Sequence, residues 1–258
     1  MQQTNRSRHR HITSFQVISL GFLSVILLGS LLLMLPIATK SGQCTSFLDA
    51  LFTATSAVCV TGLVINDTAT YWSLFGQGVI LLLIQIGGMG IITIAIAISV
   101  VSGRKIGLMQ RSTMQEAISA PTVGGIVRRT QFIIRTTILI EIIGAVLLAP
   151  VFCRDFGFWK GIWYSLFHSI SAFCNAGFDL IGIRAPFSSL TSYSVQPIIN
   201  LVIMALIVAG GIGFLTWEDI KNRKWHFKKY RMQSKVIFMV TGLLIFLPAL
   251  YFFCFEFS

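Results

Sequence analysis

Five long apolar stretches constrain this chain more strongly than any other feature of its sequence. They cover residues 12–35, 75–101, 132–152, 194–217 and 236–257. Each holds about 20 mostly apolar residues, the length that an α-helix needs to cross the hydrocarbon core of a membrane. Helices are the expected elements because lipid offers the backbone no hydrogen-bond partners. The sequence therefore predicts an all-α membrane protein with about five spanning helices.

The distribution of basic residues predicts how these helices are oriented. Four of the 20 Lys and Arg residues fall on one side of the predicted topology, and the other 16 fall on the opposite side. The four are Lys40, Arg154, Lys160 and Arg184. Because basic loops are retained in the cytoplasm, the N-terminus is predicted to be cytoplasmic, in a plasma (inner) membrane. This topology accounts for the net charge of +11, so a nucleic-acid partner is not needed, whereas membrane lipid is an expected partner.

Two shorter apolar stretches, residues 45–58 and 161–173, are too short to cross a membrane and fit re-entrant helices. "SAVCVTGL" (56–63) ends the first stretch and "SAFCNAGF" (171–178) ends the second, and the two align at an offset of 115 residues. Ser46, followed by an acidic residue three positions later, resembles a capping box at the start of the first short helix. Duplication at this spacing indicates an internal structural repeat.

A second motif is duplicated further along each repeat. "GGMG" (87–90) corresponds to "GGIG" (210–213) at an offset of 123 residues. We interpret these glycines as sites of close helix approach, with a hinge or a wide inner cavity as the alternative. Each repeat is therefore predicted to contain an outward helix, a short re-entrant helix, an irregular return and an inward helix.

These units predict the organisation of the whole chain. Residues 1–103 form the first helix–pore-loop–helix unit, 104–130 a cytoplasmic linker, 131–220 the second unit, 221–235 a basic cytoplasmic loop, and 236–258 the outward helix of a truncated third unit. The basic loop could contact anionic lipid, a cytoplasmic partner protein, or both.

The residues that follow each short helix have the chemistry of a cation path. They are Val60, Thr61, Gly62 and Leu63 in the first copy, and Asn175, Ala176, Gly177 and Phe178 in the second. A short helix presents a partial negative charge at its C-terminal end, and backbone carbonyls that cannot face lipid can replace the hydration shell of an ion. The alternative, that Gly62 and Gly177 are ordinary turn glycines in outer loops, is less favoured because the pattern occurs twice.

The sequence leaves open the roles of several polar residues. Asp67 and Asp179 lie just beyond the two segments, where they either attract cations at the pore mouth or are simply solvated loop residues. Glu141, deep in the third apolar stretch, is either a cation or proton site or a structural residue, and the structural role is favoured. A membrane enzyme that uses His168 and Glu141 is a rival hypothesis, but no ordered nucleophile–base pair supports it. The cysteines lack metal-ligand spacing, so no metal site is expected other than a cation held by the backbone carbonyls described above.

Taken together, these motifs resemble the Trk/Ktr/HKT superfamily of potassium transporters, specifically the first half of its membrane subunit. "SAVCVTGL" and "SAFCNAGF" are similar to the first two filter segments of that family, and "GGMG" and "GGIG" to its first two inward helices. The resemblance implies four linked helix–pore helix–helix units in one chain, around a central potassium pore. It also implies a homodimer that is gated by a cytoplasmic nucleotide-binding regulatory subunit of the Trk/Ktr A type.

The resemblance further implies which ions and residues take part. K⁺ would be the transported ion, moving passively or with coupled Na⁺ or H⁺, and the filter would be lined by the backbone carbonyls of residues 60–63 and 175–178. No other cofactor is expected. Because the sequence supplies two units and one further helix, either it is a truncated product or two chains combine. A non-conducting fragment or membrane scaffold is therefore the alternative function.

Overall fold

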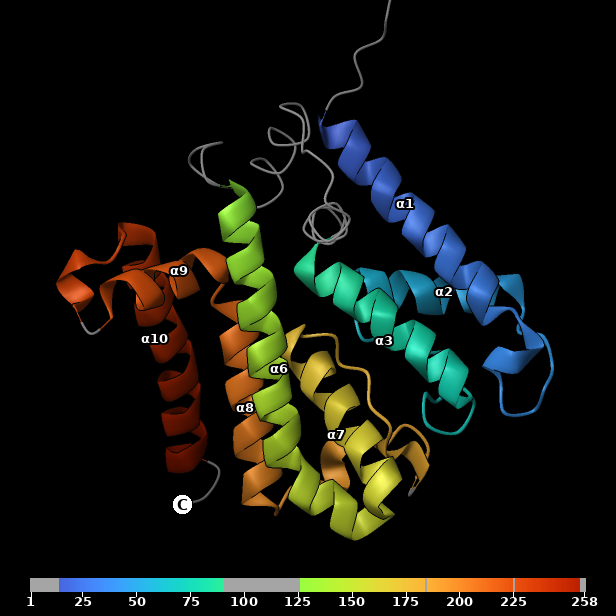
Figure 1. The fold of residues 1–258 in the computed structure, drawn as a ribbon. Helices are drawn as coiled ribbons and strands as arrows, with labels where there is room; N and C mark the ends of the chain where they lie inside the picture. Colours follow the sequence, from blue (N-terminus) through green and yellow to red (C-terminus); the bar gives the residue numbers. More distant parts are fainter. Residues whose placement is uncertain (1–13, 91–125, 184, 225, 256–258) are drawn as a thin grey trace, which may run out of the picture. The chain divides into compact units, whose positions relative to one another are not determined.

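A computed structural model describes residues 14–90, 126–183, 185–224 and 226–255 (Figure 1). Within these ranges the chain forms eight α-helices and four short 3₁₀ helices, and the extended residues make a single isolated bridge between Thr39 and Trp72. The prediction of an all-α membrane protein is confirmed. The described backbone packs as two compact units: residues 14–59, 64–66, 71–90 and 126–135 form the first, and residues 60–63, 67–70, 136–183, 185–224 and 226–255 form the second.

The first unit contains three packed helices, α1 (Ser14–Leu33), α2 (Phe47–Val58) and α3 (Leu74–Met89). A 3₁₀ turn, η1 (Pro36–Ala38), follows α1 and packs against α3. The short helix α2 begins as predicted, because the Ser46 side chain accepts a hydrogen bond from the Asp49 N–H at 3.2 Å. Such a cap satisfies a backbone donor that the first helical turn leaves unpaired.

The second unit repeats this arrangement and extends it. It includes most of α6 (Ile126–Phe156), followed by α7 (Phe158–Phe173), α8 (Pro197–Gly211), α9 (Phe214–Arg223) and α10 (Met232–Phe255). Three 3₁₀ turns connect these helices: η2 (Ile181–Ile183), η3 (Ser189–Tyr193) and η4 (Phe227–Lys229). The short helix α7 packs against α8, and it begins at Gly157 without a side-chain cap.

The observed helices can be compared with the five predicted membrane spans. Three of them, α1, α6 and α10, are long and apolar enough to cross a membrane. Over the stretch predicted as a span at 194–217, α8 and α9 pass the same test only as a pair, because the chain bends by 95° between them, so a span here would be a broken one. Gly213 at this bend has a φ of +80°, which a helix cannot continue through. The stretch predicted over 75–101 is helical up to Met89, and the linker 104–130 lies mostly outside the described residues.

In each unit two helices pack through equivalent residues, α1 on α3 in the first and α6 on α8 in the second. A Cβ atom added to Gly29 on α1 would lie 2.7 Å from Leu83 Cδ1 on α3. In the second unit, a Cβ on Gly144 of α6 would lie 2.8 Å from Leu206 Cδ1 of α8. The glycines are 115 residues apart and the leucines 123, which are the offsets of the sequence repeat. The repeat is therefore conserved in side-chain packing and not only in the motifs.

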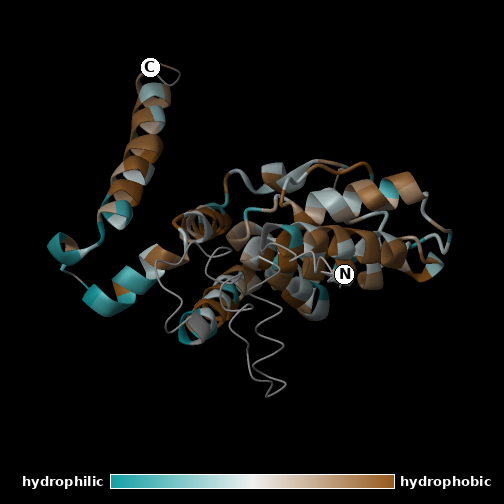
Figure 2. Ribbon diagram, turned by 90° about the horizontal axis from the view of Figure 1, so that it is seen from above, coloured by the Kyte–Doolittle hydropathy of each residue, from teal (hydrophilic) through white to brown (hydrophobic). Residues whose placement is uncertain are grey.

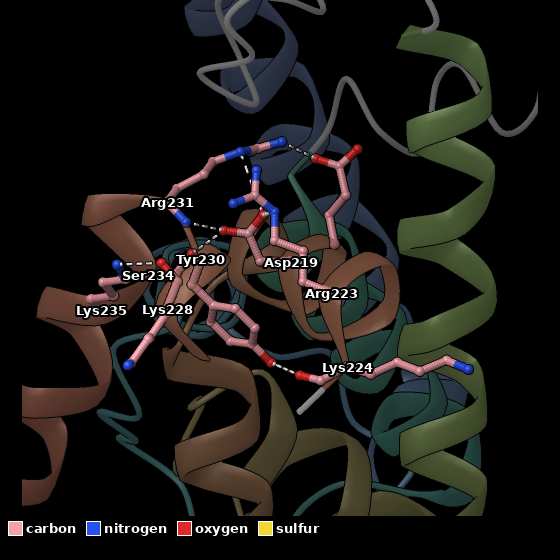
Figure 3. Close-up of polar contacts among 9 residues, drawn as sticks. Asp219, Arg223, Lys224, Lys228, Tyr230, Arg231, Ser234 and Lys235 are labelled. Atoms are coloured by element: carbon pink, nitrogen blue, oxygen red, sulfur yellow. Dashed lines mark hydrogen bonds and ion pairs between the residues drawn. The ribbon is translucent and has the colours of Figure 1, made fainter. Parts of the chain in front are cut away.

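Buried Asp219 organises the loop between α9 and α10 (Figure 3). Its Oδ2 atom accepts hydrogen bonds from the Arg231 N–H at 3.1 Å and the Ser234 hydroxyl at 2.7 Å. The guanidinium groups of Arg223 and Arg231 lie 3.8 and 3.5 Å from its Oδ1 atom. These contacts hold the basic loop at the start of α10, the hydrophobic helix that leads to the C-terminus in Figure 2.

Candidate ion-binding site

The candidate site is built from the residues that follow α2 and α7, and these residues have the same backbone conformation in both copies. Val60 and Asn175 have φ values of +56° and +58°. Gly62 and Gly177, two residues later, have φ values of +75° and +74°. The residues between each pair are not in the left-handed region. In extended backbone successive groups point to opposite sides, so reversing φ at alternate residues can turn successive carbonyls toward one side.

The first residue of each segment carries local strain. Left-handed backbone costs an ordinary residue about 1–2 kcal/mol, and a β-branched residue such as Val60 is a genuine outlier there. Asn175 is one of the residue types that tolerate this region, and its amide also lies 3.4 Å from the carbonyl oxygens of Phe173 and Ile207. Strained backbone of this kind is concentrated at functional sites.

The two predicted segments, residues 60–63 and 175–178, meet within the second unit. A Cβ atom added to Gly62 would lie 2.7 Å from the Ala176 carbonyl oxygen and 3.3 Å from Gly177 Cα. A Cβ added to Gly177 would lie 3.5 Å from Gly62 Cα. The structure thus brings together backbone from two places 115 residues apart, at the glycines that the sequence analysis singled out.

Helix α7 holds the outer end of the second segment. The Ser171 hydroxyl donates a hydrogen bond to the Phe178 carbonyl at 2.6 Å, and the Leu180 N–H donates to His168 Nε2 at 3.3 Å. The Ala176 N–H donates to the backbone carbonyl of Ser171 at 2.8 Å. These three bonds fix the segment to the helix that precedes it. From the sequence we considered His168 for a rival enzyme site and did not predict its contact with the segment.

The inward-helix glycines admit the carbonyl ends of the short helices. A Cβ on Gly87 would collide with the Val58 carbonyl, and a Cβ on Gly210 would collide with the Phe173 carbonyl. Val58 and Phe173 are the last residues of α2 and α7. The interpretation of these two glycines as close-approach sites is therefore confirmed. By contrast, a Cβ on Gly211 would meet no atom within 4 Å.

The two aspartates have different surroundings. Asp67 is buried, and its carboxylate accepts hydrogen bonds from the Thr70 N–H and hydroxyl, both at 2.8 Å, and from the Phe187 N–H at 3.0 Å. A Cβ on Gly182 would collide with this carboxylate. Asp67 therefore ties two outer loop segments together and is not a solvated loop residue. Asp179 is half-buried, and its Oδ1 atom accepts from the Ile181 N–H at 2.9 Å.

A cavity of about 240 Å³ lies beside the second segment. Its lining includes Asn175, Gly177, Phe178 and Asp179, together with His168. This lining combines peptide groups, an amide and a carboxylate, which are oxygen ligands suited to a hard cation. Among the described residues, no group of three or more His, Cys, Asp or Glu side chains is placed to hold a metal ion.

Glu141 is the remaining candidate from the sequence. It is buried in α6, and the Ser169 hydroxyl of α7 donates a hydrogen bond to its backbone carbonyl at 2.7 Å. That bond joins the outward helix to the short helix. It involves the peptide group of Glu141 and leaves the role of the carboxylate a prediction.

Comparison with known proteins finds a family model and several relatives that match this chain. A family model described as "TrkH: Cation transport protein" matches residues 2–255. The chain is 43% identical over 237 residues to the potassium/sodium uptake protein NtpJ of Enterococcus hirae, covering 92% of this chain and 51% of that protein. It is 45% identical over 231 residues to the Ktr system potassium uptake protein B of Bacillus subtilis, covering 89% and 49%. The corresponding protein of Vibrio alginolyticus is 34% identical over 243 residues, covering 93% and 52%. The chain thus spans about half the length of the curated relatives that it matches.

Proposed function

Because this chain belongs to the TrkH family of cation transport proteins, we propose that it contributes half of a potassium uptake pathway. Backbone carbonyls of residues 60–63 and 175–178 coordinate the ion in this proposal. Membership of the family agrees with the prediction of a membrane transport protein and not an enzyme. The observation that carries the proposal is the close approach of Gly62 and Gly177, two glycines with matched left-handed backbone.

The chemistry of the two segments supports a monovalent cation. Peptide oxygens are neutral ligands, so they can replace hydration water without holding the ion too tightly to release it. The carbonyl-terminal ends of α2 and α7 add a partial negative charge. Asp179, beside the second segment, adds a full negative charge at the cavity. Relatives are named for uptake of potassium, and one for potassium and sodium, which favours K⁺ as the ion, with Na⁺ or H⁺ as candidate coupled ions.

We infer partners from the same relatives and from the basic loop. The name "Ktr system" belongs to proteins of multi-component systems, so we propose a cytoplasmic nucleotide-binding regulatory subunit and a homodimeric membrane part. The N-terminus and residues 221–235 would face the cytoplasm. Asp219 and Glu218 engage Arg231, while Lys224, Lys228 and other lysines of the loop stay exposed. Exposed lysines next to a spanning helix favour contact with anionic lipid.

The alternative function is a non-conducting fragment or scaffold, because a ring of carbonyls needs more than two segments to surround an ion. The rival enzyme hypothesis is weaker. Both ring nitrogens of His168 lie within hydrogen-bond distance of backbone groups, so its imidazole is already engaged.

Cation flux into liposomes tests the proposal, with this chain and with its complete gene product compared side by side. Gly177→Ser places a side chain at φ +74° with no close clash, since the nearest atom to an added Cβ is at 3.5 Å. Gly42→Ser is the matched control, because Gly42 has a φ of +71° and open space around it. We expect Gly177→Ser to lower selectivity for K⁺ over Na⁺ and Gly42→Ser to leave it unchanged. Equal selectivity in both variants would reject the role of this segment.

A further inference from the structure

We propose that His168 and Ser171 are positioning residues that hold the outer end of the second ion-binding segment and thereby set its selectivity. The proposal rests on the proposed function of that segment. It concerns two side chains of α7 and the bonds they make just after Gly177.

The geometry around His168 assigns a single tautomer to its imidazole. The Leu180 backbone N–H, 3.3 Å from Nε2, can only donate, so Nε2 must accept. The proton of the neutral ring then lies on Nδ1, which donates to the Tyr164 carbonyl 2.7 Å away. The ring is 2% exposed and packs against Phe152, with ring centroids 5.1 Å apart. One nitrogen thus fixes the imidazole to its own helix, and the other reaches across to the segment.

Ser171 acts on the same stretch from the next turn of α7. Its hydroxyl donates to the Phe178 carbonyl at 2.6 Å. Phe178 is 2% exposed and Leu180 is fully buried, so water cannot readily take over either bond. His168 accepts from the Leu180 N–H, and Ser171 donates to the Phe178 carbonyl. Together these two bonds hold residues 178–180 against α7. The peptide groups around Gly177 are thereby fixed at their outer end.

The first repeat has no imidazole at the position that His168 occupies in the second. The residue 115 positions before His168 is Thr53, whose hydroxyl donates to the Asp49 carbonyl within its own helix at 2.8 Å. The hydroxyl of Thr53 is therefore used inside α2. The imidazole contact therefore belongs to the second segment.

Rigidity at this point bears on selectivity. When cavity size sets selectivity, a carbonyl site favours K⁺ because its oxygens cannot close around a smaller ion. Removing one buried hydrogen bond leaves a donor unpaired and lets the segment move. We expect loss of the His168 contact to lower the K⁺ to Na⁺ selectivity ratio by about twofold to tenfold, the range that corresponds to one net hydrogen bond.

Two substitutions separate positioning from packing. In His168→Gln, the amide oxygen can occupy the place of Nε2 and accept from Leu180. In His168→Asn, the shorter amide can keep the bond to Tyr164 but cannot reach Leu180. The gene product that contains the whole chain would be reconstituted in liposomes, and K⁺ and Na⁺ flux measured for both variants, with Ser171→Ala alongside. We expect His168→Asn and Ser171→Ala to lose selectivity and His168→Gln to retain most of it.

Hydrogen exchange gives a readout that does not depend on transport. Exchange of the backbone amides of residues 178–181 should accelerate in His168→Asn but not in His168→Gln. Unchanged exchange in His168→Asn would overturn the contact itself. Faster exchange with unchanged selectivity would overturn the role in selectivity. An absence of cation flux in the unsubstituted protein would refute the proposed function and the selectivity role with it, while the exchange data would still decide the contact.

Discussion

Replacing Gly210 by Ala should destabilise the protein, although alanine is the better helix former. A helical Gly→Ala change contributes about 0.5–1 kcal/mol of stability by itself. At Gly210, however, the new Cβ would collide with the Phe173 backbone carbonyl and lie 3.1 Å from Asn175 Nδ2. Overpacking costs about 1–3 kcal/mol, and the upper value applies because a backbone carbonyl cannot rotate away. The expected net loss is about 2 kcal/mol.

The neighbouring Gly211 supplies the matched control. An added Cβ there meets nothing within 4 Å, so Gly211→Ala should be neutral or gain up to about 1 kcal/mol. The two variants should then differ by about 2–3 kcal/mol, which corresponds to about 4–12 °C in melting temperature for a chain of this size. Thermal unfolding of the detergent-solubilised proteins, followed by circular dichroism, measures the difference. If Gly210→Ala melts at or above the temperature of Gly211→Ala, the close-approach reasoning is wrong.

Three further predictions follow from the other strained or buried groups. Val60→Asn should raise the melting temperature by about 2–4 °C, because relief of left-handed strain is worth about 1 kcal/mol; a lower value would argue against strain at this position. Asp67→Asn should cost about 1–3 kcal/mol, since an amide NH₂ would face N–H donors, and a denaturation curve equal to the wild-type curve would contradict this role. Asp219→Asn should weaken the contacts that order residues 221–235, so limited proteolysis of this loop should accelerate severalfold, and an unchanged cleavage rate would show that the carboxylate does not hold the loop.

Hydrophobicity and internal repetition of the sequence predict most of the architecture. A run of about 20 apolar residues has few alternatives to a membrane helix, so α1, α6 and α10 were predicted at their observed positions. The short helices α2 and α7 were also predicted, and the two copies of the glycine motif gave the candidate ion-binding residues. These features depend on local composition, which the sequence contains directly.

From the sequence, a hinge at the glycines of 210–213 was predicted only as an alternative, because hydropathy averages over a window and does not register a change of backbone direction such as the bend at Gly213. Likewise, the sequence indicated that Gly62 and Gly177 are equivalent, but equivalence does not require proximity. Their approach depends on how helices far apart in the chain pack, and that packing is set by contacts such as Gly210 against the Phe173 carbonyl.

The sequence by itself determined that this chain is helical, inserts in a membrane and repeats one structural unit, since apolar length and periodic duplication are properties of the chain alone. Only the tertiary structure decided which peptide groups face one another, which residues are strained, and that His168, Ser171 and Asp67 hold the loops in place. The physical reason is that hydrogen bonds and close contacts between distant residues depend on three-dimensional distance, which no local pattern specifies.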